Sequence, residues 1–286
     1  MTIKKVGIAF HPLNTRAPGV ARKLSAILDE RGIEYWECSA WNASEVRPRL
    51  PGTDLILSVG GDGTILRIAD ILEGATIPIA GVNIGQLGFL TEIPAEDGRE
   101  RLEALLDGKG WLDERVMLDA ELRHSVGGRE ERRIFHALND VVMTRGAIAR
   151  IIEVTASVNG AIVDTYKADG ALVASATGST GYSLAAGGPI LHPQSGHILL
   201  VPILPHLSLQ YPLVLHSTAE VTLKLSTTHM ATLSIDGHTS MELNDGASVT
   251  VRASRRRTHF LRIDPPEQFY ASLGLKLKGK YYANQD

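Results

Sequence analysis

Residues 55–64 read Leu-Ile-Leu-Ser-Val-Gly-Gly-Asp-Gly-Thr and carry the strongest structural signal in the chain. The apolar run 55–59 is typical of a buried strand, and apolar residues from Ile65 to Leu72 recur at helical spacing. A strand therefore ends in a glycine-rich turn that opens a helix. Backbone N–H groups in such a turn are not covered by side chains, so they suit the binding of phosphate.

A single carboxylate, Asp62, lies among the three glycines of this turn. A carboxylate repels an anion, so its presence indicates that a proton is removed or a metal is held, as phosphoryl transfer to a hydroxyl requires. The alternative is structural: the glycines supply positive φ angles and Asp62 caps the helix. The residues of the turn alone leave both interpretations open.

The first third of the chain alternates strand and helix patterns around this turn. Strands are expected at 6–10, 55–59 and 77–82, and helices at 17–31 and 63–72. This alternation predicts an α/β domain with a parallel sheet, whose ligands lie at the carboxyl ends of the strands. The loop 83–91 follows another strand end, so we expect it to line one cleft with the turn at 60–64.

From about residue 113 the pattern changes to short strands divided by turns. Asn159-Gly160 stands between alternating apolar runs, which is the strongest short-range signal of a hairpin. Asp236-Gly237 follows an apolar run in the same way. These patterns predict an α/β domain at 1–105, a β-rich domain at 106–264 and a tail at 265–286, helical and packed back on the first domain.

Composition limits the class of protein. The 286 residues are 44% hydrophobic, enough for two domains with their own cores. The formal net charge of −3 gives no general attraction to nucleic acid or to an anionic membrane. The single cysteine, Cys38, excludes an intramolecular disulfide and a cysteine zinc site. Without a long apolar run or a signal-peptide pattern, we expect a cytoplasmic protein with no membrane partner.

A second glycine-rich block covers residues 169–189. An apolar strand at 171–174 enters a turn from Thr177 to Ser183 that is rich in hydroxyl side chains. These hydroxyls and the glycine N–H groups can hold phosphates, ribose hydroxyls or a base amide. An ordinary Ser/Thr turn with helix capping would contain the same residue types. The block lacks the lysine of a P-loop, and Thr177 stands where a nucleophile elbow needs glycine.

Together these motifs resemble those of the NAD kinases, in the family's order, from Val6 to about Gly274. The matching residues are Gly60-Gly61-Asp62-Gly63-Thr64, Val82-Asn83-x-Gly85-x-Leu87-Gly88-Phe89-Leu90, Asn139-Asp140, Asp169-Gly170 with Thr177-Gly178-Ser179-Thr180-x-Tyr182, and Asp236-Gly237. The resemblance implies an α/β domain joined to a β-rich domain, with the active site between them.

The resemblance also implies a reaction, the phosphorylation of the 2′-hydroxyl of the adenosine ribose of NAD by ATP or polyphosphate. Asp62 would accept the proton of that hydroxyl as general base. Gly61, Gly63 and Thr64 would hold the transferring phosphate through N–H groups, and Arg67, one helical turn later, would reach a donor phosphate. Mg²⁺ would arrive with the donor phosphates, and none of the histidines has metal-ligand spacing.

For the NAD substrate, the resemblance implies that Asn139 and Asp140 hold the ribose and nicotinamide side. Residues 180–185 would bind the adenine end, with Tyr182 as an aromatic face. The remaining expected substrate contacts are Asn83, Phe89, Arg150, Lys167, Asp169, Thr177, Thr180, Gly181, Ser183, Leu184, Ala185 and His238. For the charged residues and the histidine, a solvated surface or loop role is the alternative. Asp140 stands where glutamate is common in the family.

Three other classes of protein share part of the pattern. A diacylglycerol-type lipid kinase would have the first block but also a membrane-facing patch, and a phosphofructokinase would need several arginines near the motifs. A non-catalytic NAD(P) sensor would bind the same dinucleotide, yet it gains little from a carboxylate that faces a phosphate. The resemblance further implies a homodimer or homotetramer, without nucleic acid as a partner.

Overall fold

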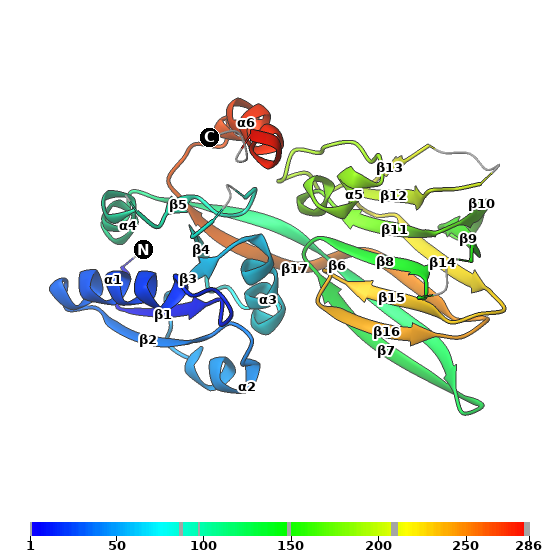
Figure 1. The fold of residues 1–286 in the computed structure, drawn as a ribbon, viewed down its shortest axis with the longest axis horizontal. Helices are drawn as coiled ribbons and strands as arrows, with labels where there is room; N and C mark the ends of the chain where they lie inside the picture. The colour runs from blue at the N-terminus through cyan, green and yellow to red at the C-terminus, as the bar shows by residue number, and fades with distance from the viewer. Residues whose placement is uncertain (1, 86–87, 97, 148–149, 207–210, 283–286) are drawn as a thin grey trace. The chain divides into compact units, whose positions relative to one another are not determined.

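The computed structural model describes residues 2–85, 88–96, 98–147, 150–206 and 211–282 (Figure 1). These residues form two compact units. Unit 1 comprises Met1–Glu114 and Thr258–Asp286, and unit 2 comprises Arg115–Arg257. The chain leaves unit 1 along strand β6 (Trp111–Val126) and returns along strand β17 (Ser248–Arg262).

The division therefore falls inside two long strands, whereas the sequence prediction placed it at 105/106 and 264/265. Residues 106–114 and 258–264 belong to unit 1 and not to the β-rich unit. The physical reason is that β6 and β17 run unbroken from one unit into the other, so no loop or turn in the sequence marks the boundary.

Unit 1 is built on a parallel sheet, as predicted. Neighbouring strands follow the order β4-β3-β1-β2, with β5 paired to β4. Its strands are β1 (Lys5–Phe10), β2 (Glu34–Ser39), β3 (Leu55–Gly60), β4 (Ile79–Asn83) and β5 (Ile93–Pro94). Its helices are α1 (Ala17–Glu30), α2 (Ala43–Val46), the 3₁₀ turn η1 (Arg47–Arg49), α3 (Asp62–Leu72), α4 (Arg99–Leu106) and α6 (Gln268–Tyr282).

The core of unit 1 follows from the sequence pattern. Every residue of β3 is buried, as expected for a central strand covered on both faces. Helix α1 presents Val20, Leu24 and Leu28 to the sheet, where they pack with residues of β1 and β3. This core places the carboxyl end of β3 and the start of α3 on a rigid base.

Unit 2 is all-β apart from short turns of helix, again as predicted. A six-stranded antiparallel sheet has the order β13-β12-β11-β8-β15-β16, and a second antiparallel set has the order β10-β9-β14-β17. The strands are β7 (Arg129–Ala137), β8 (Asp140–Arg145), β9 (Ile152–Val158), β10 (Ala161–Ala168), β11 (Gly170–Ser175), β12 (Ile198–Ile203), β13 (Leu213–Leu215), β14 (Glu220–Ser226), β15 (Ala231–Ile235) and β16 (Thr239–Leu243). The helical turns are η2 (Thr177–Thr180) and α5 (Tyr182–Ala185).

The two predicted hairpin turns are present. Asn159 and Gly160 join β9 to β10 with φ angles of 51° and 83°, and Val158 pairs with Ala161. Asp236 and Gly237 join β15 to β16 with φ angles of 49° and 68°. Both turns need left-handed backbone, which asparagine, aspartate and glycine adopt most readily.

Strand β8 separates a core face from a polar face. Val141 and Met143 belong to the main hydrophobic core of unit 2, so the residues between and beside them face the other side of the sheet. This face is polar at its two ends, Asp140 and Thr144, whereas Val142 between them packs in a smaller hydrophobic cluster. Among the helices described, none combines the length and the apolar character that a bilayer span requires.

Candidate functional site

The turn between β3 and α3 is extended at Gly61, with φ −105° and ψ −171°, and helix α3 begins at Asp62. None of Gly60, Gly61 and Gly63 has a positive φ angle, and no side-chain hydrogen bond caps the helix. The structural interpretation of this turn, in which positive-φ glycines and a capping aspartate explain its sequence, is therefore wrong.

The glycines of the turn differ in what surrounds them. A Cβ atom added to Gly60 would lie 2.1 Å from Thr64 Oγ1, so packing alone requires this glycine. At Gly61 and Gly63, an added Cβ would meet no atom of the described chain within 4 Å. Neither packing nor backbone conformation requires these two glycines. The remaining physical reason is that their N–H groups stay open to a group from outside the protein.

The carboxylate of Asp62 is held by the loop that follows β4. Its two oxygens accept hydrogen bonds from the backbone N–H groups of Phe89, at 2.8 Å, and Leu90, at 3.0 Å. A Cβ atom on Gly88 would lie 2.1 Å from Asp62 Oδ1, so the loop can approach the carboxylate only with glycine at this position. The structure thus brings the turn 60–64 and the loop 83–91 together.

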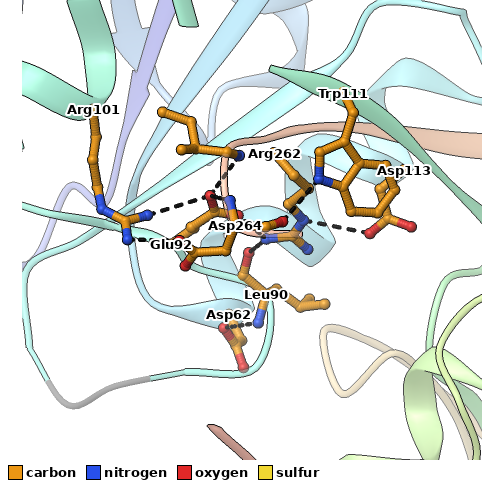
Figure 2. A network of polar contacts seen from close by, with 9 residues as sticks. Asp62, Leu90, Glu92, Arg101, Trp111, Asp113, Arg262 and Asp264 are labelled. Carbon is orange, nitrogen blue, oxygen red and sulfur yellow. Dashed lines mark hydrogen bonds and ion pairs between the residues drawn. The ribbon is translucent and has the colours of Figure 1, made fainter. Parts of the chain in front are cut away.

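Behind this loop lies a buried arginine that sequence reasoning missed, Arg262 at the end of β17 (Figure 2). Its Nη1 donates to the Leu90 carbonyl at 2.7 Å, and it forms ion pairs with Asp113 at 3.4 Å and Glu92 at 3.6 Å. The same residue, Leu90, donates its N–H to Asp62. Arg262 therefore holds the carbonyl of the residue whose N–H holds Asp62.

Glu92 anchors the neighbouring backbone in the same network (Figure 2). Its Oε1 accepts the N–H groups of Ile263 at 2.6 Å and Asp264 at 2.8 Å. Asp264 in turn pairs with Arg101 at 2.7 Å and accepts the indole N–H of Trp111 on its carbonyl at 2.8 Å. A network of this kind holds its members in one geometry, because each lost partner would leave a poorly solvated polar group.

The other predicted residues of unit 1 already have partners within the protein. The N–H of Thr64 donates to the Gly61 carbonyl at 3.0 Å, and its side chain is buried. Arg67 stacks its guanidinium on the ring of Trp41, 4.4 Å from the centroid. Asn83 accepts the N–H of Gly85 at 3.0 Å. Their predicted contacts with substrate stay predictions.

Unit 2 contains a pocket of about 330 Å³ on the polar face of β8. Three predicted residues, Asn139, Asp140 and Tyr182, line it together. The lining residues that sequence reasoning did not select are Val142, Thr144, Ser234, Asp236 and Gly237. They come from β8, from β15 and from the turn that follows β15, and the register of the two strands places Val142 opposite Ser234.

Asp236 fixes the backbone at the head of β8. Its buried carboxylate accepts three backbone N–H groups, from Leu138 at 2.7 Å, Asn139 at 2.7 Å and Asp140 at 2.9 Å. The Asp236-Gly237 pair was recognised in the sequence only as a family motif and a turn. Its role in holding Asn139 and Asp140 could not be read there, because Asn139 and Asp236 are separated by 97 positions.

The buried acids of the pocket are not satisfied equally. Burial raises the pKa of Asp140 to about 7, with a further rise from the charge of Asp236. Burial also raises the pKa of Asp236 to about 6, although its three N–H donors oppose the rise. Within the described residues, the Asp140 carboxylate accepts no hydrogen bond, and the buried Asn139 Oδ1 has no partner. Both groups are placed to contact a ligand.

The second glycine-rich block packs directly on Asn139 and Asp140. A Cβ atom on Gly178 would lie 2.1 Å from the Asn139 carbonyl oxygen, and one on Gly181 would lie 3.4 Å from Asn139 Nδ2. Thr180 donates its hydroxyl to the Thr177 carbonyl at 3.2 Å. Three further predicted residues follow in α5: buried Ser183, half-buried Leu184 and exposed Ala185.

Apart from Tyr182, the predicted residues of the second glycine-rich block do not line the pocket, and neither do four further predicted residues of unit 2. Arg150 lies 2.9 Å from His229, and Lys167 pairs with Glu153 at 3.2 Å. Asp169 pairs with Arg145 at 2.8 Å. The fourth, His238, directs its Nδ1 to the Asp236 carbonyl at 3.3 Å. Each has a partner inside the protein, so their substrate contacts stay predictions.

Metal ligation by the chain itself was not predicted. Across the part of the chain that the structure describes, no group of three or more His, Cys, Asp and Glu side chains is arranged to hold a metal ion. The carboxylates of Asp62 and Asp236 already accept hydrogen bonds from backbone N–H groups.

Comparisons with known proteins place these features in one family. The family model of the ATP-NAD kinase N-terminal domain matches residues 20–110, and that of the ATP-NAD kinase C-terminal domain matches residues 138–263. An NAD kinase of Dehalococcoides mccartyi is 50% identical over 277 residues, 96% of each chain. An NAD kinase of Chloroflexus aurantiacus is 36% identical over 96% of this chain and 99% of its own.

Solved structures with the same fold include two kinases of this kind. An NAD kinase from Archaeoglobus fulgidus in complex with ATP has a TM-score of 0.77 and 25% identity, over 96% of this chain and 99% of its own. Yeast NADH kinase complexed with NADH has a TM-score of 0.82 and 21% identity, over 100% of this chain and 90% of its own. The second likeness concerns the fold alone.

Proposed function

The chain belongs to the NAD kinase family and has that family's activity, and we propose that Asp62 is the general base that activates the 2′-hydroxyl of the adenosine ribose. The observation that carries this proposal is the position of the Asp62 carboxylate. It is held by two backbone N–H groups and lies beside Gly61 and Gly63, where an added Cβ would meet no described atom within 4 Å. The matching family models and the relatives named above are NAD kinases, which favours this activity over the lipid kinase, phosphofructokinase and sensor alternatives.

In the proposed reaction, the terminal phosphate of the donor lies at the start of α3, where the N–H groups of Gly61 and Gly63 are open. The 2′-hydroxyl approaches this phosphate and gives its proton to Asp62. A bond forms between the hydroxyl oxygen and phosphorus while the bond from phosphorus to the leaving phosphate oxygen breaks. Because both oxygens of Asp62 accept hydrogen bonds, the carboxylate is already oriented before the reaction and loses little conformational freedom in it.

The proposed NAD site is the pocket of unit 2. Asn139 and Asp140 have polar atoms without partners there, which suits the hydroxyl groups of a ribose. Tyr182, which is 46% exposed, offers an aromatic face to a base. We propose that this pocket and the Asp62 site serve the same reaction.

Both ATP and polyphosphate are candidate donors, and the structural relative from Archaeoglobus fulgidus was solved with ATP. We propose that Mg²⁺ enters with the donor phosphates as part of the substrate. Mg²⁺ is commonly held by one or two carboxylates together with substrate phosphates, which is the reason for this proposal.

The test is NADP formation by the purified protein with NAD, Mg²⁺ and either donor, compared with Asp62→Asn. The variant is expected to lose about 10²–10⁴-fold in kcat, the usual contribution of a positioned base. Calorimetric NAD binding by the variant serves as the control and should be unchanged. Undiminished turnover by Asp62→Asn would remove Asp62 from its proposed role.

A further inference from the structure

The C-terminal helix α6 belongs to unit 1 and brings a lysine to the Asp62 site. The ammonium nitrogen of Lys276 lies 5.8 Å from the centroid of the Phe89 ring. The backbone N–H of the same Phe89 donates to Asp62. Lys276 therefore lies on the side chain of the residue whose main chain orients the carboxylate. Its position could not be anticipated from motifs, because the tail carries none.

The positive charge of Lys276 is poorly compensated. Its side chain is half-buried, and in the described ranges it forms no ion pair with a carboxylate. Burial and the nearby charge of Arg262 lower its pKa, while the charges of Asp62, Glu92 and Asp264 raise it. Lysines are mostly solvated, and a partly desolvated ammonium without a partner is unfavourable unless an anion completes its surroundings.

The carboxylates near Lys276 are already engaged. Asp62 accepts the N–H groups of Phe89 and Leu90, and Glu92 accepts two other backbone N–H groups. Arg262, the second cation of this region, has a buried Nη2 atom without a hydrogen-bond partner. In this region the Lys276 ammonium and Arg262 Nη2 are therefore cationic donors without a hydrogen-bond acceptor among the described residues.

We propose that Lys276 binds the terminal phosphate of the phosphoryl donor next to Asp62, an inference that rests on the proposed function. The glycine N–H groups at the start of α3 suit one side of a phosphate, and Asp62 adds a negative charge that repels it. An ammonium group on the Phe89 ring offsets that repulsion while leaving the carboxylate available as a base. The ligand class is a polyphosphate anion, either a nucleoside triphosphate or inorganic polyphosphate.

The test is calorimetric titration of the full-length protein with ATP and, separately, with inorganic tripolyphosphate, each with Mg²⁺. Lys276→Met keeps most of the side-chain length and removes the charge. It is expected to weaken binding of both anions by about 10-fold or more, the scale of a hydrogen bond to a charged group. Lys276→Arg should recover part of the loss. NAD affinity should stay within about 2-fold of wild type for all variants.

The matched control is Lys23→Met, which removes an exposed lysine of α1 and should change neither titration. Loss of tripolyphosphate binding alone would assign the site to inorganic polyphosphate. Equal binding by wild type and Lys276→Met, a loss confined to ATP, or no anion binding by wild type would overturn the inference. Donor binding that depends on Lys276 in a protein that forms no NADP would instead contradict the proposed function alone.

Discussion

At the scale of single residues, the two acids of the unit 2 pocket differ in what surrounds their carboxylates. Asp236 is buried but accepts three backbone N–H groups, which offset part of the cost of burying its charge. Asp140 is equally close to the pocket and accepts no hydrogen bond within the described chain. A buried acid of the second kind is retained at the expense of stability, which is typical of a group that serves a ligand.

Asp140→Asn is therefore expected to stabilise the protein at alkaline pH. The pKa of Asp140 is raised to about 7 in the folded protein, above the ordinary aspartate value of 3.8, so the folded state binds more protons between these values. Stability of the wild type then falls as the pH rises from about 4 to 7, and the variant avoids this loss. The gain should reach about 1–4 kcal/mol at pH 8 and vanish near pH 4.

Thermal unfolding of the two proteins from pH 4 to 8 measures this difference, and NAD titration should show weaker binding by the variant. Asp236→Asn is the matched comparison, because it exchanges an acceptor of three N–H groups for a mixed donor and acceptor. It should lose stability by about 1–3 kcal/mol. A variant of Asp140 that is no more stable than wild type at pH 8 would contradict the assignment of a strained, unpaired carboxylate.

At the scale of elements, the turn after β3 and the loop after β4 act together. Each is an irregular segment at the carboxyl end of a parallel strand, and such ends lie on one edge of the sheet. Gly88 is the point of contact, since no larger residue fits against Asp62 Oδ1. The function of this loop is to supply two N–H groups, which its side chains do not reveal.

Gly88→Ala should displace either the loop or the carboxylate and thereby lower activity. A misplacement of about 1 Å at a catalytic group costs on the order of 10²-fold in rate. The control is Gly85→Ala in the same loop, where an added Cβ meets nothing within 4 Å and φ is not positive. Steady-state kinetics should show a large fall in kcat for the first variant and none for the second. Equal kcat values would show that Asp62 tolerates a shift of its loop.

Strand β2 (Glu34–Ser39) is an element that the hydrophobic pattern of the sequence did not predict. It lies at the edge of the parallel sheet and pairs only with β1 among the described strands. Its sequence, Glu-Tyr-Trp-Glu-Cys-Ser, has two acids and no continuous apolar run, because only Trp36 and Cys38 are buried. The buried strand β3, which is covered on both faces, was predicted correctly over 55–59.

At the scale of the whole molecule, the chain leaves unit 1 after Glu114 and returns to it at Thr258, once half of its residues have formed unit 2. The return places Arg262 against Leu90, a residue 172 positions earlier, and against Asp113, 149 positions earlier. Unit 1 is thus completed only after unit 2 has been synthesised. The environment of Asp62 depends on both parts of the sequence.

Arg262→Met is expected to destabilise unit 1 and to lower kcat more than NAD affinity. Removing the guanidinium breaks its buried ion pairs with Asp113 and Glu92, although Glu92 keeps Arg101 at 3.4 Å, and the loss of a partner from a buried ion pair costs about 3–5 kcal/mol. Urea unfolding measures the stability, and the kinetic constants report the loosened Leu90 peptide. The control is Arg99→Met, which removes exposed ion pairs and should change neither quantity. An unaltered midpoint for Arg262→Met would contradict the role of this network.

The sequence by itself determined the α/β character of the first third, the β-rich character of the middle and the hairpin turns, and it singled out Asp62 as the candidate base. These properties can be predicted from hydrophobic periodicity, turn residues and short motifs, each of which involves only a few neighbouring positions. Only the tertiary structure decided which groups surround the chemistry: the N–H groups of Phe89 and Leu90, the buried Arg262, the anchoring Asp236 and the half-buried Lys276. Such contacts join residues far apart in the chain, so they depend on the path of the backbone through space, which no local pattern records.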